Sequence, residues 1–124
     1  MTRRGGYVNP RRQPSTGAPR PLNSAAMNPD SYTSMTEVRA GVDELDRQLV
    51  ALLGQRFAHM RAAARIKPDR SAVRDEARKQ QVIDQAMAEA ERVGAPVDVI
   101  ADLWEQLVEA SIAYEMTEFD RTRG

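Results

Sequence analysis

Two cationic residues, Arg56 and Lys67, interrupt the apolar pattern of one long segment of the chain. From Thr36 to Lys67, apolar residues recur at steps of three and four, which predicts one face of an α-helix. Arg56 continues this face, and Lys67 follows eleven residues later, within about 20° of three full turns and about 16 Å along the axis. A buried cation is costly unless an anion compensates it. The spacing therefore indicates either an anion-binding site or an internal ion pair.

Further polar residues fall on the predicted apolar faces of two later segments. Arg78 begins one of these faces, and Ser111 and Glu115 lie one turn apart on the other. Arginine binds carboxylates through two parallel hydrogen bonds, whereas lysine acts as a point charge. The set suits a small polyanion that carries an ether or hydroxyl group. The alternative is a set of internal ion pairs, such as Arg56 with Glu115.

Arg39 lies on the same long segment but in a different direction. It precedes Arg56 by seventeen residues, which places it about 100° round the helix and about 25 Å away. One copy of the helix cannot direct Arg39, Arg56 and Lys67 at one small ligand. Two antiparallel copies could do so.

The elements that carry these residues are all predicted to be helical. The first helix ends before Pro68, because proline disfavours helix in the residue before it and has no N–H. The second begins near Asp75 and stops at Gly94, and the third begins with Pro96 in its first turn. No segment shows the alternation typical of a strand. The sequence predicts an all-α chain with a long, a medium and a second long helix.

Composition limits the chemistry and favours an oligomer. The 124 residues contain no cysteine and a single histidine, His59, so we expect neither a disulfide nor a zinc site of the usual kind. The hydrophobic content of 41% is modest for a self-sufficient core. A first helix of about 48 Å also has an apolar face too long for two shorter helices to cover. Self-association is the expected remedy.

The charges divide the chain into two predicted parts. Residues 1–34 carry five arginines and one aspartate and are rich in Pro, Gly, Ser and Asn, which favours a disordered basic tail. Residues 35–124 carry 13 basic and 17 acidic residues and offer no basic surface that would suit a nucleic acid. No secretory signal or membrane span is apparent, so a cytoplasmic location is expected. Met27 or Met35 could also be the true start.

The ordered spacing of Arg39, Arg56 and Lys67, followed by the motif Val73-Arg74-Asp75 and then Arg78, resembles the all-helical class of chorismate mutase. It is also similar to a close relative of that class, isochorismate-pyruvate lyase. The resemblance covers residues 36–124. It implies an intertwined homodimer in which the long first helices pair and two active sites form. Each site would draw one arginine from the partner chain.

The resemblance also implies roles for individual residues. Arg39 would come from the partner, and Arg56 and Arg78 would bind the substrate carboxylates. Lys67 would donate a hydrogen bond to the ether oxygen of the breaking bond. No cofactor is implied. The complete expected set is Lys67 and Glu115 as catalytic residues, with Arg39, Arg56, Asp75, Arg78, Lys79 and Ser111 as substrate-binding residues.

Two positions depart from the mutase pattern. Glu115 replaces a glutamine that donates to the ether oxygen in many members, so it would have to be protonated or serve as an ion-pair partner of Lys67 or Arg56. Lys79 replaces a glutamate that contacts the ring hydroxyl in many mutases, and the lyases also lack that glutamate. The expected activity is conversion of chorismate to prephenate. The alternatives are the lyase reaction giving salicylate and pyruvate, a mutase acting on 4-amino-4-deoxychorismate and, more distantly, a non-enzymatic helical interaction module.

Overall fold

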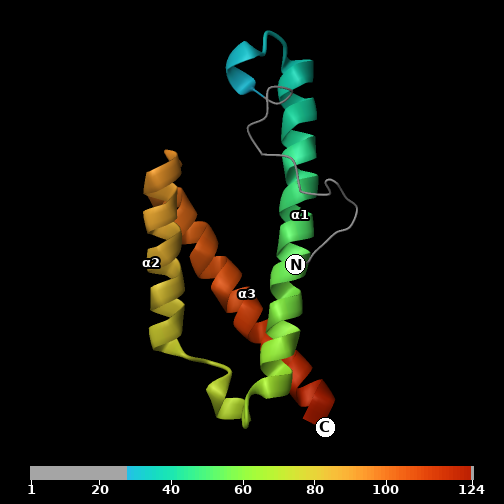
Figure 1. Ribbon diagram of the computed structural model, residues 1–124, viewed down its shortest axis with the longest axis vertical. Coiled ribbons are helices and arrows are strands. Elements are labelled where there is room, and N and C mark those ends of the chain that lie inside the picture. Colours follow the sequence, from blue (N-terminus) through green and yellow to red (C-terminus); the bar gives the residue numbers. More distant parts are fainter. Residues whose placement is uncertain (1–27, 124) are drawn as a thin grey trace, which may run out of the picture. The chain divides into compact units, whose positions relative to one another are not determined.

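Three α-helices dominate the computed structural model, which describes residues 28–123. They are α1 (Met35–Ile66), α2 (Glu76–Val93) and α3 (Val97–Arg123), with the short 3₁₀ helices η2 (Pro29–Ser31) and η3 (Arg70–Ala72) (Figure 1). No strand occurs between residues 28 and 123. The prediction of an all-α chain with three helices is therefore confirmed. The chain forms two compact parts that meet within α1, the first ending at Val50 and the second beginning at Ala51.

The start of α1 is fixed by a reciprocal cap. Glu37 Oε1 accepts hydrogen bonds from the backbone N–H groups of Thr33 and Ser34, at 2.8 and 3.0 Å, and the Glu37 N–H donates to Ser34 Oγ. These residues and η2 belong to the segment predicted as a tail, so its last residues, from 28 onward, have a defined conformation. The rest of that prediction, residues 1–27, lies outside the described residues.

Helix α2 begins and ends where the sequence signals indicate. The carboxylate of Asp75 accepts a hydrogen bond from the backbone N–H of Arg78 and so caps the first turn. Gly94 takes the left-handed conformation, with φ of 78°, and closes the last turn through its own N–H. These caps fix the two ends of α2.

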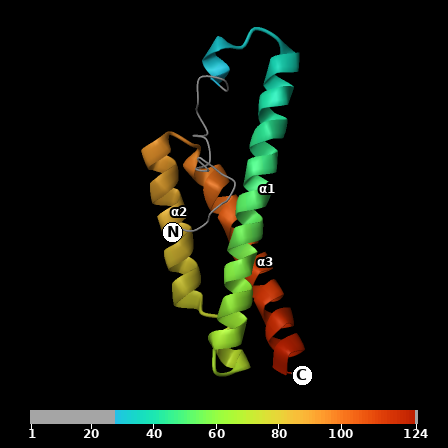
Figure 2. The ribbon, with the colours of Figure 1, turned by 45° about the vertical axis from the view of Figure 1, so that its right-hand side comes forward.

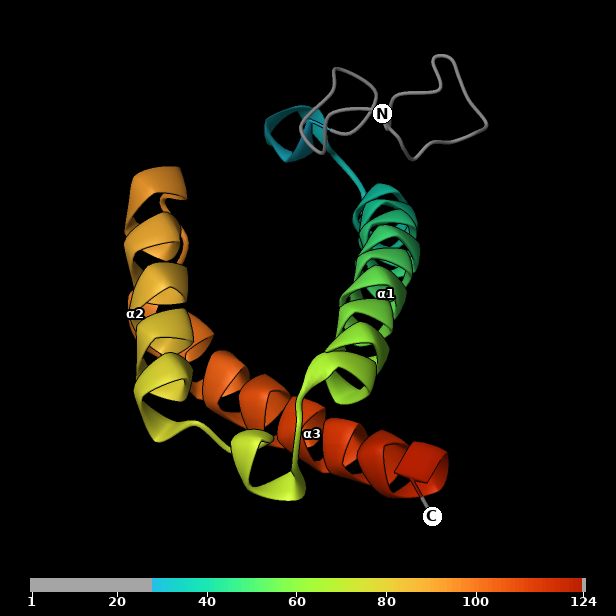
Figure 3. The same ribbon diagram turned by 60° about the horizontal axis from the view of Figure 1, so that its bottom comes forward.

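The hydrophobic core of the second part joins the end of α1 to the C-terminal half of α3. Ala64, Val73 and Phe119 are buried together, and Ile112 and Met116 pack against them. Figures 2 and 3 show this end of α3 beside the last turns of α1 and the connection through η3. Because this connection leads directly to α2, the core also fixes the start of the loop between Lys67 and Asp75.

Several apolar side chains of α1 are half exposed among the residues that the structure describes. Val42, Leu49 and Leu52 are each about half exposed, at 48, 54 and 52%. An uncovered apolar face of this length is unusual for a protein that functions as a single chain. Among the described residues, no helix combines the length and the apolar character needed to cross a membrane.

Candidate functional site

A cavity of about 330 Å³ lies within the second compact part. Its size falls within the range of small-molecule sites, which starts at about 300 Å³. The walls come from α1, α2, α3 and the loop that follows α1. It contains seven of the eight residues that the sequence suggests: Arg56, Lys67, Asp75, Arg78, Lys79, Ser111 and Glu115.

Arg56 reaches from α1 to α3 through a hydroxyl group. Its Nη1 donates to Ser111 Oγ at 2.5 Å, and Ser111 Oγ donates in turn to the carbonyl of Leu107 at 2.7 Å. Ser111 is buried, so this chain of hydrogen bonds holds the guanidinium in place. The pKa of Arg56 lies below its usual value, because burial disfavours the cation and the positive charge of Arg78 repels it. Arg56 is thus hydrogen-bonded to the neutral hydroxyl group of Ser111 and is repelled by a second cation, Arg78.

Lys67 forms an ion pair with Glu115, one of the pairings that the sequence allowed. Its Nζ lies 2.7 Å from Glu115 Oε2, and Glu115 is almost completely buried, with 4% of its surface exposed. Within residues 28–123, Glu115 Oε2 accepts no hydrogen bond of good geometry, so the contact rests on charge attraction rather than on an aligned N–H. Nζ also lies 3.4 Å from the carbonyl of Val73, a long contact. Glu115 therefore pairs with Lys67, and the alternative pair with Arg56 does not form.

Arg78 and Asp75 stand at the N-terminus of α2. The Asp75 carboxylate caps the helix by accepting a hydrogen bond from the backbone N–H of Arg78. The Arg78 guanidinium donates to Gln81 Oε1 at 2.7 Å and is exposed. In the part of the chain that the structure describes, neither Arg78 nor Arg56 forms an ion pair with a carboxylate.

Lys79 is engaged by acidic residues that sequence reasoning missed. Its Nζ lies 2.7 Å from both Glu105 Oε2 and Glu109 Oε2, and Arg74 Nη2 lies 2.7 Å from Glu109 Oε1. These contacts raise the pKa of Lys79, and Arg74 and Lys79 lower the pKa of Glu109 to about 2. The group joins α2 to α3 at the edge of the cavity. The spacing of Glu105 and Glu109, one helical turn apart, was the available signal.

Arg39 belongs to the other compact part and is exposed on α1. It is not among the residues that line the cavity. Its expected role in a partner's site stays a prediction.

The charges that line the cavity suit an anion with two negative groups. Four cationic and two acidic residues line it, a net excess of two positive charges. The charge of Lys67 is matched by Glu115, and Lys79 is held by Glu105 and Glu109. The two guanidinium groups remain for a ligand, and each can bind one carboxylate. Residues 28–123 contain no group of three or more His, Cys, Asp or Glu side chains that could hold a metal ion.

The chain is similar in sequence to proteins of one known family. Residues 38–116 match the model of the family described as chorismate mutase type II. An isochorismate pyruvate lyase of Pseudomonas aeruginosa is 26% identical over 96 residues, which cover 77% of this chain and 95% of that protein. The family match includes the segments that form the cavity.

Proposed function

Because the chain belongs to the chorismate mutase type II family, we propose that it binds chorismate in this cavity and rearranges it to prephenate. The proposal rests on the position of Arg56 and Arg78 and on the groups that they contact. Both line the cavity with Lys67, and among the described residues neither has a carboxylate partner. Chorismate carries two carboxylates, one for each guanidinium.

A bound dianion would relieve an unfavourable arrangement of charges. Arg56 is partly buried and lies close enough to Arg78 for its pKa to fall. A carboxylate between or beside the two groups replaces this repulsion by two attractions and supplies charge-assisted hydrogen bonds. The cavity therefore favours an anionic ligand over a neutral one.

Lys67 is proposed to act on the ether oxygen of the substrate. In the rearrangement a carbon–oxygen bond breaks while a carbon–carbon bond forms within the same molecule, and negative charge develops on the ether oxygen. A fixed ammonium stabilises that charge more in the transition state than in the bound substrate, which is the condition for faster turnover. Glu115 would serve as the anion that directs the Lys67 ammonium into the cavity, since the two groups already lie 2.7 Å apart.

A second candidate is the lyase reaction on isochorismate. It is favoured by the similarity to the Pseudomonas aeruginosa isochorismate pyruvate lyase, which extends over 95% of that protein. Isochorismate also carries two carboxylates and an ether oxygen, so the same three cations could bind it. The two reactions differ in which atoms the bound conformer brings together, a matter of positioning.

The product decides between these candidates. Purified protein would be incubated separately with chorismate and with isochorismate, and the products separated and identified. Prephenate from chorismate is the expected result. Salicylate and pyruvate from isochorismate, without prephenate, would establish the lyase instead, and turnover of neither substrate would reject the proposal. Protein with Lys67→Met, prepared in the same way, controls for contaminating host enzymes.

We further propose that two chains pair along α1. The half-exposed apolar residues Val42, Leu49 and Leu52 need a cover, and a second copy offers an equally long apolar face. Antiparallel pairing would bring Arg39 of one chain toward the cavity of the other. Each site would then contain residues from both chains.

Mixing inactive variants tests this shared site. The wild-type protein is expected to sediment as a dimer. Exchanging subunits between Arg39→Ala and Lys67→Ala proteins should restore about a quarter of wild-type turnover, because half of the dimers are mixed and each has one intact site. Mixing Arg56→Ala with Lys67→Ala is the matched control and should restore nothing, since these residues belong to the same chain's cavity. A stable monomer with full activity, or equal recovery in both mixtures, would contradict the shared site.

A further inference from the structure

Lys67, the proposed catalytic residue, follows directly after the end of α1. The last backbone carbonyls of a helix have no N–H donors within the helix. Helix α1 ends at Ile66, so Lys67 is already outside it. The carbonyl of Ala64 would accept from the residue four positions later, but that residue is Pro68, which has no N–H. The backbone N–H of Lys67 still donates to Ala63, at 2.9 Å. The carbonyls around Lys67 need donors from elsewhere.

Arg123, in the last turn of α3, supplies those donors. Its Nη2 lies 2.9 Å from the carbonyl oxygen of Ala64 and 3.0 Å from those of Arg65 and Lys67. One nitrogen with two hydrogens thus serves three carbonyls, so at least one bond is shared. A cation is also favoured at the C-terminal end of a helix, where the carbonyl dipoles converge.

The guanidinium of Arg123 is itself held in place. It lies over the ring of Phe119, 4.0 Å from the ring centre, and Phe119 is part of the buried core beneath the end of α1. Stacking on an aromatic face restricts the rotation of the arginine. Figure 3 shows the two chain segments involved, the end of α3 and the end of α1, next to each other.

We propose that Arg123 is a positioning residue for Lys67. By fixing the backbone carbonyl of Lys67, it sets the direction in which the side chain leaves the helix end, so that Nζ reaches Glu115 inside the cavity. This inference rests on the proposed function for its catalytic consequence, but not for the contact itself. A purely structural role would stabilise the fold without changing the environment of the Lys67 ammonium.

A measurement without substrate tests the positioning. The sequence contains only two lysines, Lys67 and Lys79, and both line the cavity. Protein labelled with ¹³C-lysine should therefore give two side-chain Cε signals, assigned with Lys67→Arg and Lys79→Arg variants. Arg123→Ala should shift or broaden the Lys67 signal and leave the Lys79 signal in place. Arg121→Ala is the matched control, because Arg121 lies in the same last turn and pairs with Glu118, and it should move neither signal.

Turnover provides the second measurement. Arg123→Ala should lower kcat roughly 10- to 100-fold with a smaller change in KM, since misplacing a catalytic group by about 1 Å has effects of that order. Arg123→Lys, which keeps the charge, should recover part of the loss. In a Lys67→Met background the same Arg123→Ala change should have almost no further effect, because both changes remove one contribution.

Different outcomes would reject the positioning role of Arg123 and the proposed enzymatic activity. A Lys67 signal unchanged by Arg123→Ala, or both lysine signals shifted together with a lower melting temperature, would overturn the positioning role. So would losses in turnover that multiply in the double variant. Wild-type protein that converts neither chorismate nor isochorismate would reject the proposed function, while the selective shift of the Lys67 signal would still support the contact.

Discussion

Replacing Lys67 with methionine is expected to lower turnover on the order of 10²–10³-fold, the usual effect of losing one preorganised donor to a developing oxyanion. Methionine keeps much of the length of the side chain but removes the charge. Because negative charge appears on the ether oxygen only in the transition state, the loss should fall on kcat, with KM little changed. Steady-state kinetics with chorismate measure both constants.

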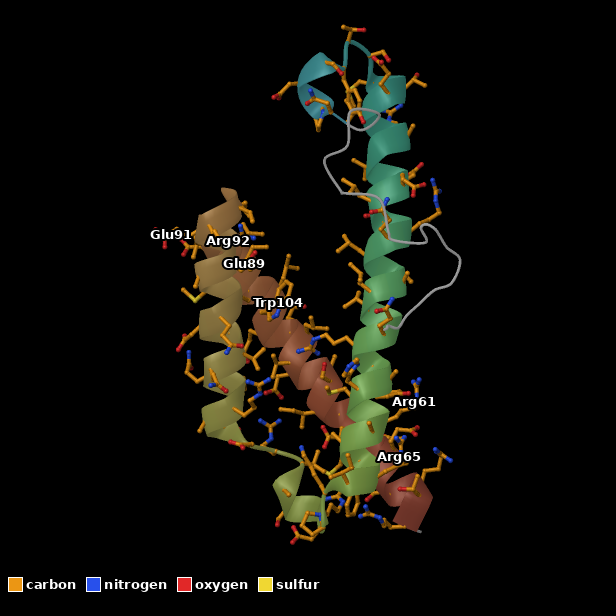
Figure 4. All side chains as sticks on the ribbon, viewed as in Figure 1. Arg61, Arg65, Glu89, Glu91, Arg92 and Trp104 are labelled. Atoms are coloured by element: carbon orange, nitrogen blue, oxygen red, sulfur yellow. The ribbon has the colours of Figure 1, made fainter. Side chains whose placement is uncertain are left out.

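A second variant separates catalysis from folding. Lys67→Met leaves Glu115 buried without its cation, which by itself destabilises a protein. Adding Glu115→Gln removes the unpaired charge and should restore the melting temperature but not the turnover. Arg65→Met is the matched control, since Arg65 lies on the side of α1 turned away from α2 (Figure 4) and should retain full turnover. Recovery of turnover in the Lys67→Met/Glu115→Gln protein would show that Lys67 has no catalytic charge to contribute.

Replacing Arg56 with alanine is expected to lower kcat/KM by on the order of 10²–10³, the range for truncating one partner of a buried charged hydrogen bond. A carboxylate is present in both the substrate and the transition state, so the larger share of the loss should appear in KM. Arg56→Lys should recover little, because an ammonium cannot reproduce the two parallel hydrogen bonds of a guanidinium. Substrate titration of the initial rate gives the comparison.

The neighbouring arginine on α1 provides the control for Arg56. Arg61 donates a hydrogen bond to the hydroxyl of Tyr114 on α3 but does not line the cavity. Figure 4 shows it on α1 with Arg65. Arg61→Ala therefore removes a guanidinium and a contact between α1 and α3 without removing a proposed substrate contact. Equal increases in KM for Arg56→Ala and Arg61→Ala would mean that the effect is structural and that Arg56 does not bind the carboxylate.

Local sequence patterns were enough to predict the three helices and the faces on which their polar residues lie. Helical periodicity is local, so steps of three and four residues placed Arg56 and Lys67 on one face of α1. Pro68, Asp75 and Gly94 marked helix ends because each acts on the hydrogen bonds of its own turn. The ordered spacing then indicated the family, to which the chain belongs.

Which polar side chains contact one another depends on tertiary packing and could not be predicted from these patterns. From the sequence, Glu115 could pair with Arg56 or with Lys67. In the structure, the packing of α3 against the end of α1 places Glu115 beside Lys67, and Arg56 donates a hydrogen bond to Ser111 instead. These contacts join residues 48 and 55 positions apart, so they depend on how the helices cross, and helical periodicity does not contain that information.

Two further sets of contacts, those of Lys79 and of Arg123, also depend on tertiary packing. Lys79 is held by Glu105 and Glu109, and Arg123 reaches the carbonyls around Lys67, although neither set of partners is close in sequence. The pattern of Lys79 and Arg123 along their own helices is that of ordinary exposed cations. Lys79 meets its partners because α2 packs on α3, and Arg123 meets its partners because the buried Phe119 and its neighbours hold the end of α3 against the end of α1. In both cases hydrophobic packing fixes the distances over which the charged groups interact.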